Sequence, residues 1–193
     1  MAWSNETAQS LCCAIETPRL QIRPLTGSHA DLVFAPMQDD ALYEWISMEK
    51  PAQLETLRAH WTRRERRLSP DASELWPSWV VISRQQGAII GELDAAIDES
   101  MACINFGYFF FPPFWGKGFA TEAVQAAVKH LLRQGTTRLI ATVTAGNTAS
   151  TRVLQKAGFS FSRVIPDNDI LRGNLVDDEE YVLSQSPNSP SPQ

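Results

Sequence analysis

The sequence predicts an α/β protein of the α+β kind, with a central mixed but mostly antiparallel sheet of about six to seven strands flanked by helices. Two observations support this fold class. Three short apolar stretches follow one another closely in the middle of the chain, which is typical of an antiparallel meander. Helical and strand patterns then alternate towards the C-terminus, which favours some parallel pairing. Together the two patterns predict both kinds of pairing in one sheet.

The N-terminal part predicts one strand and two helices. Residues 19–25 alternate apolar and polar side chains, as a half-buried strand does. Residues 28–37 suit a short helix with Ser28 as its cap. Residues 51–68 suit a second helix, because Pro51 is compatible with a first turn and large apolar residues follow at helical spacing.

The middle of the chain predicts the antiparallel meander. A strand over residues 79–83 is followed by a tight turn at residues 85–87 and a partner strand over residues 88–97. A third strand covers residues 102–111. Pro112 ends it, because proline cannot donate a hydrogen bond to a sheet ladder.

The C-terminal part predicts two helices and three strands. An apolar stripe at helical spacing runs through residues 118–133. A strand over residues 138–144, a helix over 147–157 and a strand over 159–164 follow. A last strand covers residues 180–184. This alternation of helix and strand predicts that part of the sheet is parallel.

Domain organisation is predicted to be simple. We expect a flexible N-terminal tail over residues 1–14, one domain over residues 15–184 and a disordered Pro/Ser-rich tail over residues 185–193. No repeat, linker or change of composition interrupts the middle range.

Charge and cysteine content exclude several classes of protein. With 17 basic and 22 acidic residues, the net charge of −5 argues against duplex nucleic acid as a partner. The basic residues gather once, at Arg63, Arg64, Arg66 and Arg67, which we interpret as a solvated helix face. Three cysteines without CxxC spacing predict neither a disulfide framework nor a zinc site.

We expect a cytoplasmic protein that has no membrane partner. The N-terminus lacks the basic start and apolar run of a signal peptide. No stretch approaches the roughly 18 apolar residues of a membrane span. The three histidines show no metal-ligand spacing, and no metal cofactor is expected.

A glycine-containing loop before the helix over residues 118–133 is the most informative stretch. Gly116 and Gly118 allow close approach of the backbone to a ligand, and a helix N-terminus favours an anion such as a diphosphate. Lys117 is followed by glycine rather than Ser or Thr, which excludes the nucleotide-hydrolase P-loop. The dinucleotide fingerprint also fails, because the chain offers no acid about 20 residues further on.

Three blocks of sequence resemble the GNAT acetyltransferases. Residues 115–123, WGKGFATEA, are similar to their motif Q/R-x-x-G-x-G/A, with Trp115 at the position usually held by Gln or Arg. Residues 147–159 resemble the motif N-x-x-S-x-x-x-x-x-K-x-G-F of the branch of ribosomal-protein-alanine N-acetyltransferases. The opening ETPRLQIRPL, residues 16–25, is the third match, and residues 173–183 loosely resemble the last strand of that branch.

The resemblance implies an enzyme that binds acetyl-CoA as co-substrate in a cleft between two strands that separate. The main chain of residues 109–111 would pair with the pantetheine arm as an added strand does, and the amides of residues 116–121 would hold the diphosphate. Asn147 would bind pantetheine, cap a helix, or both. The residues expected at the cofactor are Phe109, Phe110, Phe111, Gly116, Lys117, Gly118, Phe119, Ala120, Thr121, Asn147, Ser150 and Lys156.

The catalytic groups implied by the resemblance are partly replaced. Many relatives use a Tyr as general acid where this chain has Leu154, so Ser150 is expected to take that role. Relatives often carry a Glu base where this chain has Asn105, two residues before Gly107 and Tyr108. Glu92 and Asp94 on the preceding strand share one face and are the nearest substitutes, while a water-mediated route also stays open.

The acceptor is expected to be a primary amine, either a protein N-terminus or a small molecule. Tyr43 and Trp45 fall where relatives build the acceptor wall, although large aromatic residues are more often core. Asp94 and Tyr108 are the other residues expected at the acceptor. An alternative is an antibiotic or a polyamine as the acceptor, in which case the reaction is the same and only the acceptor differs. The protein is expected to be a monomer or a homodimer.

A different class of function is a catalytically degenerate member that binds acyl-CoA as a sensor or interaction module. Asn105 and Leu154, which replace the common Glu and Tyr, are its motivation. The intact glycine loop and Ser150 favour the enzyme.

Overall fold

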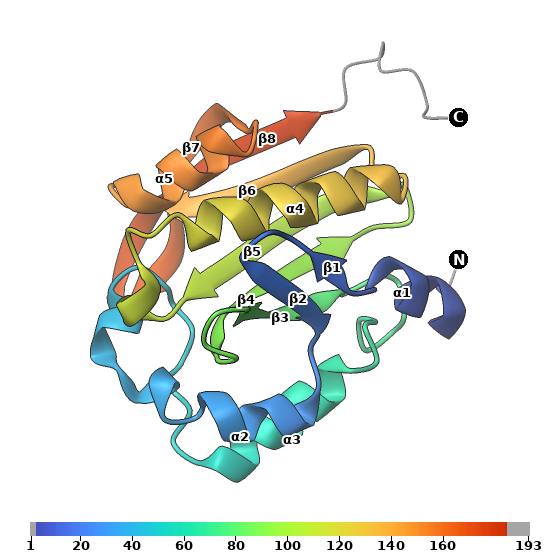
Figure 1. The fold of residues 1–193 in the computed structure, drawn as a ribbon. Coiled ribbons are helices and arrows are strands. Elements are labelled where there is room, and N and C mark those ends of the chain that lie inside the picture. The colour runs from blue at the N-terminus through green and yellow to red at the C-terminus, as the bar shows by residue number, and fades with distance from the viewer. Residues whose placement is uncertain (1–2, 185–193) are drawn as a thin grey trace.

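A computed structural model describes residues 3–184, which form one eight-stranded sheet with helices on both of its faces (Figure 1). The strand order is β1-β2-β3-β4-β5-β6-β8-β7. The strands are β1 (Ile15–Glu16), β2 (Leu20–Pro24), β3 (Ser78–Ser83), β4 (Ile89–Ile97), β5 (Ala102–Phe110), β6 (Arg138–Thr144), β7 (Ser160–Leu171) and β8 (Asn174–Ser184). The α-helices are α1 (Asn5–Leu11), α2 (Ala30–Val33), α3 (Leu54–Arg64), α4 (Phe119–Arg133) and α5 (Thr148–Lys156).

The mixed, mostly antiparallel sheet that the sequence predicts is confirmed. Strands β3, β4 and β5 form the expected antiparallel meander, and β5 with β6 is the parallel pair. The sheet has eight strands rather than six to seven, because the two-residue strand β1 adds to its edge. A pair this short carries no hydrophobic pattern that a sequence could reveal.

Two hydrophobic clusters cover the two faces of the sheet. The first includes Val124, Ala127 and Leu131 of α4, which pack against apolar residues of the central strands. The second includes Leu57 and Trp61 of α3 and the residues around α2. In Figure 1, α4 and α5 lie on one side of the sheet and α2 and α3 on the other. The side chains of each strand therefore alternate between two different cores.

The N-terminal segment differs from the expected flexible tail. Residues 5–11 form α1, whose Ser4 side chain caps the helix by accepting a hydrogen bond from the Thr7 amide. Ala8 and Leu11 are buried in the first cluster. The segment was expected to be flexible because most of its residues are polar, and only these two side chains of α1 are buried. Residues 1–2 and the expected tail over residues 185–193 lie outside the described residues.

Two further elements differ in extent from the sequence prediction. The helix expected over residues 28–37 is broken into α2 and two short 3₁₀ turns, and Thr26 rather than Ser28 precedes the first of them. At the C-terminal end, β7 and β8 form a long hairpin whose turn residues Arg172 and Gly173 both have positive φ, at 53° and 81°. Such a turn matches the twist of the two strands, but Arg-Gly is not among its usual sequence signals.

Candidate active site

The parallel pair β5–β6 is joined only at one end, and this opens the sheet. Ala102 pairs with Arg138 and Cys103 with Leu139, after which the two strands separate. A cleft of about 1050 Å³ fills the opening, with a lining drawn from β4, β5, β6, α4 and α5 and from the segment around Trp45. Beyond Cys103, the edge of β5 that faces β6 is therefore left without a partner strand.

Strand alternation divides the cleft between the two faces of the sheet. Glu92 and Asp94 of β4 lie opposite Phe109 and Gly107 of β5, and all four share the α3 face. Tyr108 lies opposite Leu93 and packs against the first cluster, on the face covered by α4 and α5. Acidic and hydroxyl side chains thus reach the same opening from opposite sides.

The start of α4 forms one wall of the cleft. Gly116 and Gly118 have φ of 70° and 77°, a left-handed region in which glycine is favoured. Gly118 precedes the first helical residue, and among the described residues no side chain caps this helix end. The first-turn amides are donors that need an acceptor, and the helix dipole favours an anion there. A Cβ on Gly116 would meet nothing within 4 Å, so the loop is open on that side.

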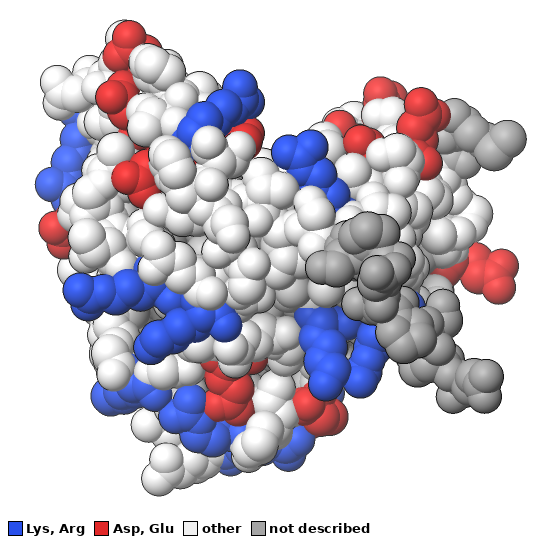
Figure 2. Space-filling view, turned by 90° about the horizontal axis from the view of Figure 1, so that it is seen from above, with Lys and Arg blue, Asp and Glu red and all other residues white. Residues whose placement is uncertain are grey.

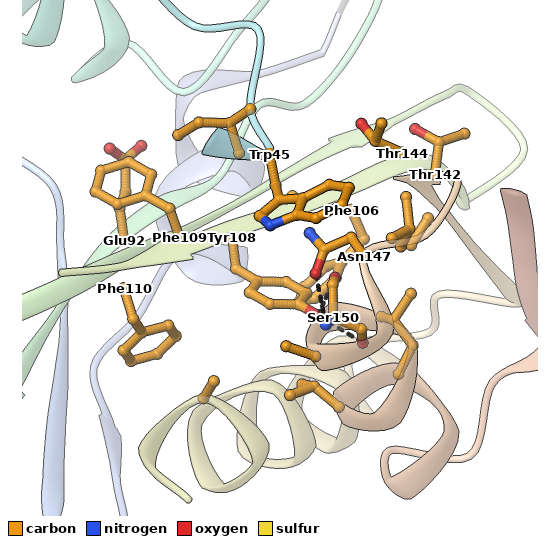
Figure 3. Close-up of a pocket in the computed structure, with 18 of the residues that line it drawn as sticks. Trp45, Glu92, Phe106, Tyr108, Phe109, Phe110, Thr142, Thr144, Asn147 and Ser150 are labelled. Carbon is orange, nitrogen blue, oxygen red and sulfur yellow. Dashed lines mark hydrogen bonds between the residues drawn. The ribbon is translucent and has the colours of Figure 1, made fainter. Parts of the chain in front are cut away.

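The start of α5 forms the second wall. The Asn147 side chain accepts a hydrogen bond of 3.1 Å from the Ser150 amide, which makes Asn147 the helix cap. Ser150 is therefore free of the capping role. Its Oγ instead lies 2.7 Å from the Tyr108 Oη, and that hydroxyl also donates to the Ser150 carbonyl at 3.2 Å. Figure 3 shows the Tyr108 ring reaching towards Ser150, with Asn147 beside it.

Tyr108 is a protonated hydroxyl at neutral pH. Burial raises the pKa of Tyr108 to about 12, against the opposing effect of its hydrogen bond with Ser150. The pair therefore presents two neutral hydroxyls to the cleft.

A buried charge cluster lies on the α3 face. Arg64 forms an ion pair with Glu92 and lies 3.6 Å from Asp94, and it also donates to the Ser78 hydroxyl at 3.0 Å. Glu92 is 3% exposed, whereas the Asp94 side chain is 38% exposed. Arg64 thus points inwards, which corrects the interpretation that it belongs to a solvated helix face. Four nearby arginines in sequence do not reveal which of them the helix turns towards the sheet.

Burial dominates the ionisation of both carboxyls. Desolvation, reinforced by the charge of Asp94, raises the pKa of Glu92 to about 7 although Arg64 opposes the shift. Desolvation also raises the pKa of Asp94, again against Arg64. A carboxyl whose pKa lies near neutrality can both take up and release a proton under physiological conditions.

Most residues expected at the site line the cleft. Besides those described above, the lining includes Trp45, Asn105, Phe109, Phe110, Phe119, Ala120, Thr121 and Lys156. Asn105 is exposed and lies on the same face as Asp94. The indole of Trp45, shown in Figure 3, lies against the turn before α5, since a Cβ on Gly146 would lie 3.7 Å from that indole.

Three of the expected residues lie elsewhere. Phe111 follows the last residue of β5; its side chain is 2% exposed and belongs to the second cluster, so the role expected of its main chain stays a prediction. Lys117 donates to the Pro113 carbonyl at 2.8 Å. Tyr43 donates to the Met37 carbonyl at 2.7 Å and packs with the second cluster. The side chains of all three are used in local packing or hydrogen bonding.

Two contacts of the site could not be predicted from the sequence. Tyr108 was expected at the acceptor, but its contact with Ser150 joins residues 42 positions apart. Arg64 reaches Glu92 across 28 positions. Contacts of this kind follow from the way in which α5 and α3 dock on the sheet, and no local pattern records that docking.

The charge distribution, the possible metal ligands and the helices of residues 3–184 bear on the expectations from the sequence. Seen from above the view of Figure 1, Lys and Arg side chains are interspersed with Asp and Glu rather than gathered in one field (Figure 2). Among residues 3–184, no cluster of three His, Cys, Asp or Glu side chains could hold a metal ion. No described helix combines the length and apolar character needed to cross a bilayer.

Comparison with known proteins identifies similar sequences and folds. Residues 19–160 match the family described as acetyltransferase (GNAT) domain. An uncharacterised N-acetyltransferase of Bacillus subtilis (strain 168), YoaA, is 25% identical over 171 residues, which cover 88% of this chain and 95% of that protein.

Two solved structures share the fold at lower identity. One is RimL, a ribosomal L7/L12 alpha-N-protein acetyltransferase in complex with coenzyme A, with a TM-score of 0.78, 20% identity and coverage of 89% of this chain and 97% of that one. The other is the ribosomal-protein-S5-alanine acetyltransferase from Vibrio fischeri, with a TM-score of 0.78, 19% identity and coverage of 92% and 99%.

Proposed function

The chain belongs to the GNAT acetyltransferase family, and we propose that it transfers the acetyl group of acetyl-CoA to a primary amine, either a protein N-terminus or a small amine. The observation that carries this proposal is the opening between β5 and β6, which begins after Cys103 and ends at the uncapped start of α4. An extended thioester ligand with a diphosphate at one end fits this shape and these donors.

The donor half of the site uses the backbone. The unpaired edge of β5 offers main-chain groups to a pantetheine arm, as an edge strand does to an added strand. The amides at the start of α4 offer donors to the diphosphate. Acetyl-CoA supplies an activated thioester, so the amine can attack its carbonyl carbon directly.

Ser150 is the group proposed to act at the leaving sulfur. Tyr108 has one hydrogen, which can go either to the Ser150 carbonyl or to the Ser150 Oγ, and when it goes to Oγ the Ser150 hydrogen is left to point into the cleft. Ser150 can then pass that proton to the sulfur as the carbon–sulfur bond breaks, and the second proton of the nitrogen, released as the amide forms, restores the serine hydroxyl. Tyr108 acts through Ser150, and we regard it as a positioning residue.

Glu92 and Asp94 are proposed to serve the amine. An amine must lose a proton to attack, and Asp94 is the more accessible of the two carboxyls. Glu92, with a pKa raised to about 7, is the proposed proton acceptor. Asn105 lies on the same face and can orient the acceptor by hydrogen bonding, but an amide takes no proton at neutral pH.

A protein N-terminus is the acceptor that the neighbours favour, since both solved structures cited above are named as ribosomal-protein acetyltransferases. Trp45 on the rim of the cleft supports an acceptor that enters beside it. Polyamines and aminoglycosides remain the small-molecule alternatives to be compared directly.

Acetyl-CoA turnover tests the proposal. Release of free thiol would be followed with N-terminal peptides, amino acids, polyamines and aminoglycosides, and coenzyme A binding would be measured by calorimetry on the same sample. Turnover with one acceptor class is the expected result. Binding without turnover on the full panel would favour the sensor function that Asn105 and Leu154 suggest, and absence of coenzyme A binding would overturn the assignment of the cleft.

A further inference from the structure

The N-terminal segment ETPRL binds the first turn of α4. The Thr17 hydroxyl donates to Glu122 Oε1 at 2.6 Å, and the Arg19 amide donates to the same oxygen at 3.0 Å. The Arg19 Nε donates to Glu122 Oε2 at 2.5 Å, as part of an ion pair. Three donors from a segment about 100 residues away therefore bind one carboxylate of α4, the helix whose N-terminus is the proposed diphosphate site.

Arg19 also holds the glycine loop itself. Its Nη1 donates to the Lys117 carbonyl at 3.0 Å, and its guanidinium lies 4.6 Å from the centre of the Phe119 ring. The carbonyl of Lys117 and the N–H of Gly118 belong to one trans peptide, so they point in opposite directions. Because Arg19 draws the carbonyl to its own side, the Gly118 N–H is turned away from Arg19.

The negative charge of Glu122 would repel a diphosphate at the start of α4, and the positive charge of Arg19 offsets this repulsion. Partial burial would raise the pKa of Glu122, but hydrogen bonds from Thr17 and Arg19 and the charge of Arg19 lower it below its usual range, so the side chain is a carboxylate. A carboxylate in the first turn interacts well with the helix dipole. It also repels any second anion at the same helix end, and a diphosphate is such an anion.

We propose that Arg19 is a positioning residue for the diphosphate of acetyl-CoA. Arg19 neutralises the charge of Glu122 and fixes the orientation of the Lys117–Gly118 peptide. This inference rests on the proposed function. It gives the N-terminal segment a role in donor binding, although its side chains lie on β2 and on the turn before it, outside the lining of the cleft.

Calorimetric titration with coenzyme A tests this role in four variants. Arg19→Gln leaves Glu122 charged, and we expect the dissociation constant to rise by about 5- to 30-fold. Arg19→Lys keeps a positive charge beside Glu122, and we expect it to lie between Arg19→Gln and the wild type. The double variant Arg19→Gln/Glu122→Gln removes both charges, and we expect it to recover the part of the affinity that charge neutralisation supplies, while the part due to the Arg19–Lys117 hydrogen bond stays lost. Arg23→Gln is the matched control, because it breaks the ion pair between Arg23 on β2 and Glu16 on β1 without touching the loop.

The outcomes separate charge neutralisation from a general loss of structure. If the double variant binds coenzyme A as weakly as Arg19→Gln, or if Arg19→Gln binds as tightly as the wild type, the proposed role is wrong. A merely structural ion pair predicts that the double variant is at least as impaired as the single one. If the wild type itself does not bind coenzyme A, the proposed function fails instead, and the two failures are thereby distinguished.

Discussion

At the scale of single residues, we propose that the Tyr108–Ser150 pair takes the place of the tyrosine that many relatives carry at the position of Leu154. Leu154 is buried in the first cluster and has no group that could donate a proton. A phenol from β5 instead approaches the same helix and contacts Ser150. In the proposed mechanism, the proton donor for the leaving group would therefore depend on two residues from two elements.

Removal of the Ser150 hydroxyl should slow chemistry more than binding. Ser150→Ala is expected to lower kcat by about 100-fold, because the thiolate loses its proton donor. Tyr108→Phe should lower kcat less, since the serine hydroxyl remains but loses its orientation. Steady-state kinetics with acetyl-CoA as the varied substrate would measure both effects. Thr151→Ala, which removes the next hydroxyl of α5 where it faces Tyr181, should behave as the wild type; an unchanged kcat in Ser150→Ala would remove Ser150 from the mechanism.

Glu92 should determine the alkaline rise of the pH–rate profile. Its raised pKa of about 7 means that the carboxyl loses its proton, and can act as a base, only as the pH passes through neutrality. The wild-type kcat/KM should therefore increase through about pH 7, and Glu92→Gln should lack that increase and be roughly 100-fold slower at pH 8. A variant profile that superimposes on that of the wild type would exclude Glu92 as the base.

At the scale of elements, Arg64 links α3 to β4 through charges rather than apolar contacts. Its guanidinium interacts with the two carboxyls of β4 and donates to the Ser78 hydroxyl of the neighbouring strand β3. A buried ion pair is weak evidence of net stabilisation, but loss of one partner leaves the other charges unpaired.

Loss of Arg64 should therefore destabilise the fold in a pH-dependent way. Arg64→Met is expected to lower the free energy of unfolding by about 3 kcal/mol at pH 8, where the buried Glu92 and the partly exposed Asp94 would be left without their cation. The pKa values of Glu92 and Asp94 are already raised in the folded state, and removal of the cation raises them further. Groups with raised folded-state pKa values favour the folded state below those values and disfavour it above, so the loss should be smaller at pH 5.

Urea unfolding at the two pH values would measure this difference. Arg63→Met is the matched control, because its side chain lies one position away on the exposed face of α3. An equal loss for Arg64→Met at pH 5 and pH 8 would show that packing, and not charge, accounts for the contribution of Arg64.

At the scale of the whole molecule, the sheet is joined continuously except at the opening between β5 and β6. Strands β3 and β4 are paired on both sides, whereas β5 is paired with β6 at two positions. A ligand that inserts there completes the hydrogen bonding of the sheet and connects its two halves.

Coenzyme A should consequently protect the opening selectively. At a hundredfold excess over its dissociation constant, it should stabilise the fold by about 2.7 kcal/mol. Hydrogen exchange should slow at the β5 amides beyond Cys103 that face β6 and at the start of α4, while β3 serves as the internal control. Uniform slowing across the sheet, without extra protection at the opening, would contradict insertion between the strands.

The sequence by itself determined the fold class and the glycine loop before α4. Alternating apolar patterns specify strands, and the glycines before α4 specify an open helix start, because both depend on neighbours within a few residues. The bounds of β6 coincide with the prediction, and those of α5 differ by one residue at each end. Of the two roles expected of Asn147, the helix cap, which is strictly local, is observed, and the binding of pantetheine stays a prediction.

Only the tertiary structure decided which distant side chains meet in the cleft and beside it. The contacts of Tyr108 with Ser150, of Arg64 with Glu92 and of Arg19 with Glu122 each join segments that are far apart in sequence. Tyr43 and Phe111 were placed in a core rather than in the cleft by the same packing. The physical reason is that the position in which a helix docks on a sheet depends on the sum of many weak apolar contacts. Each polar contact at the site forms only if that position is correct to within about an ångström.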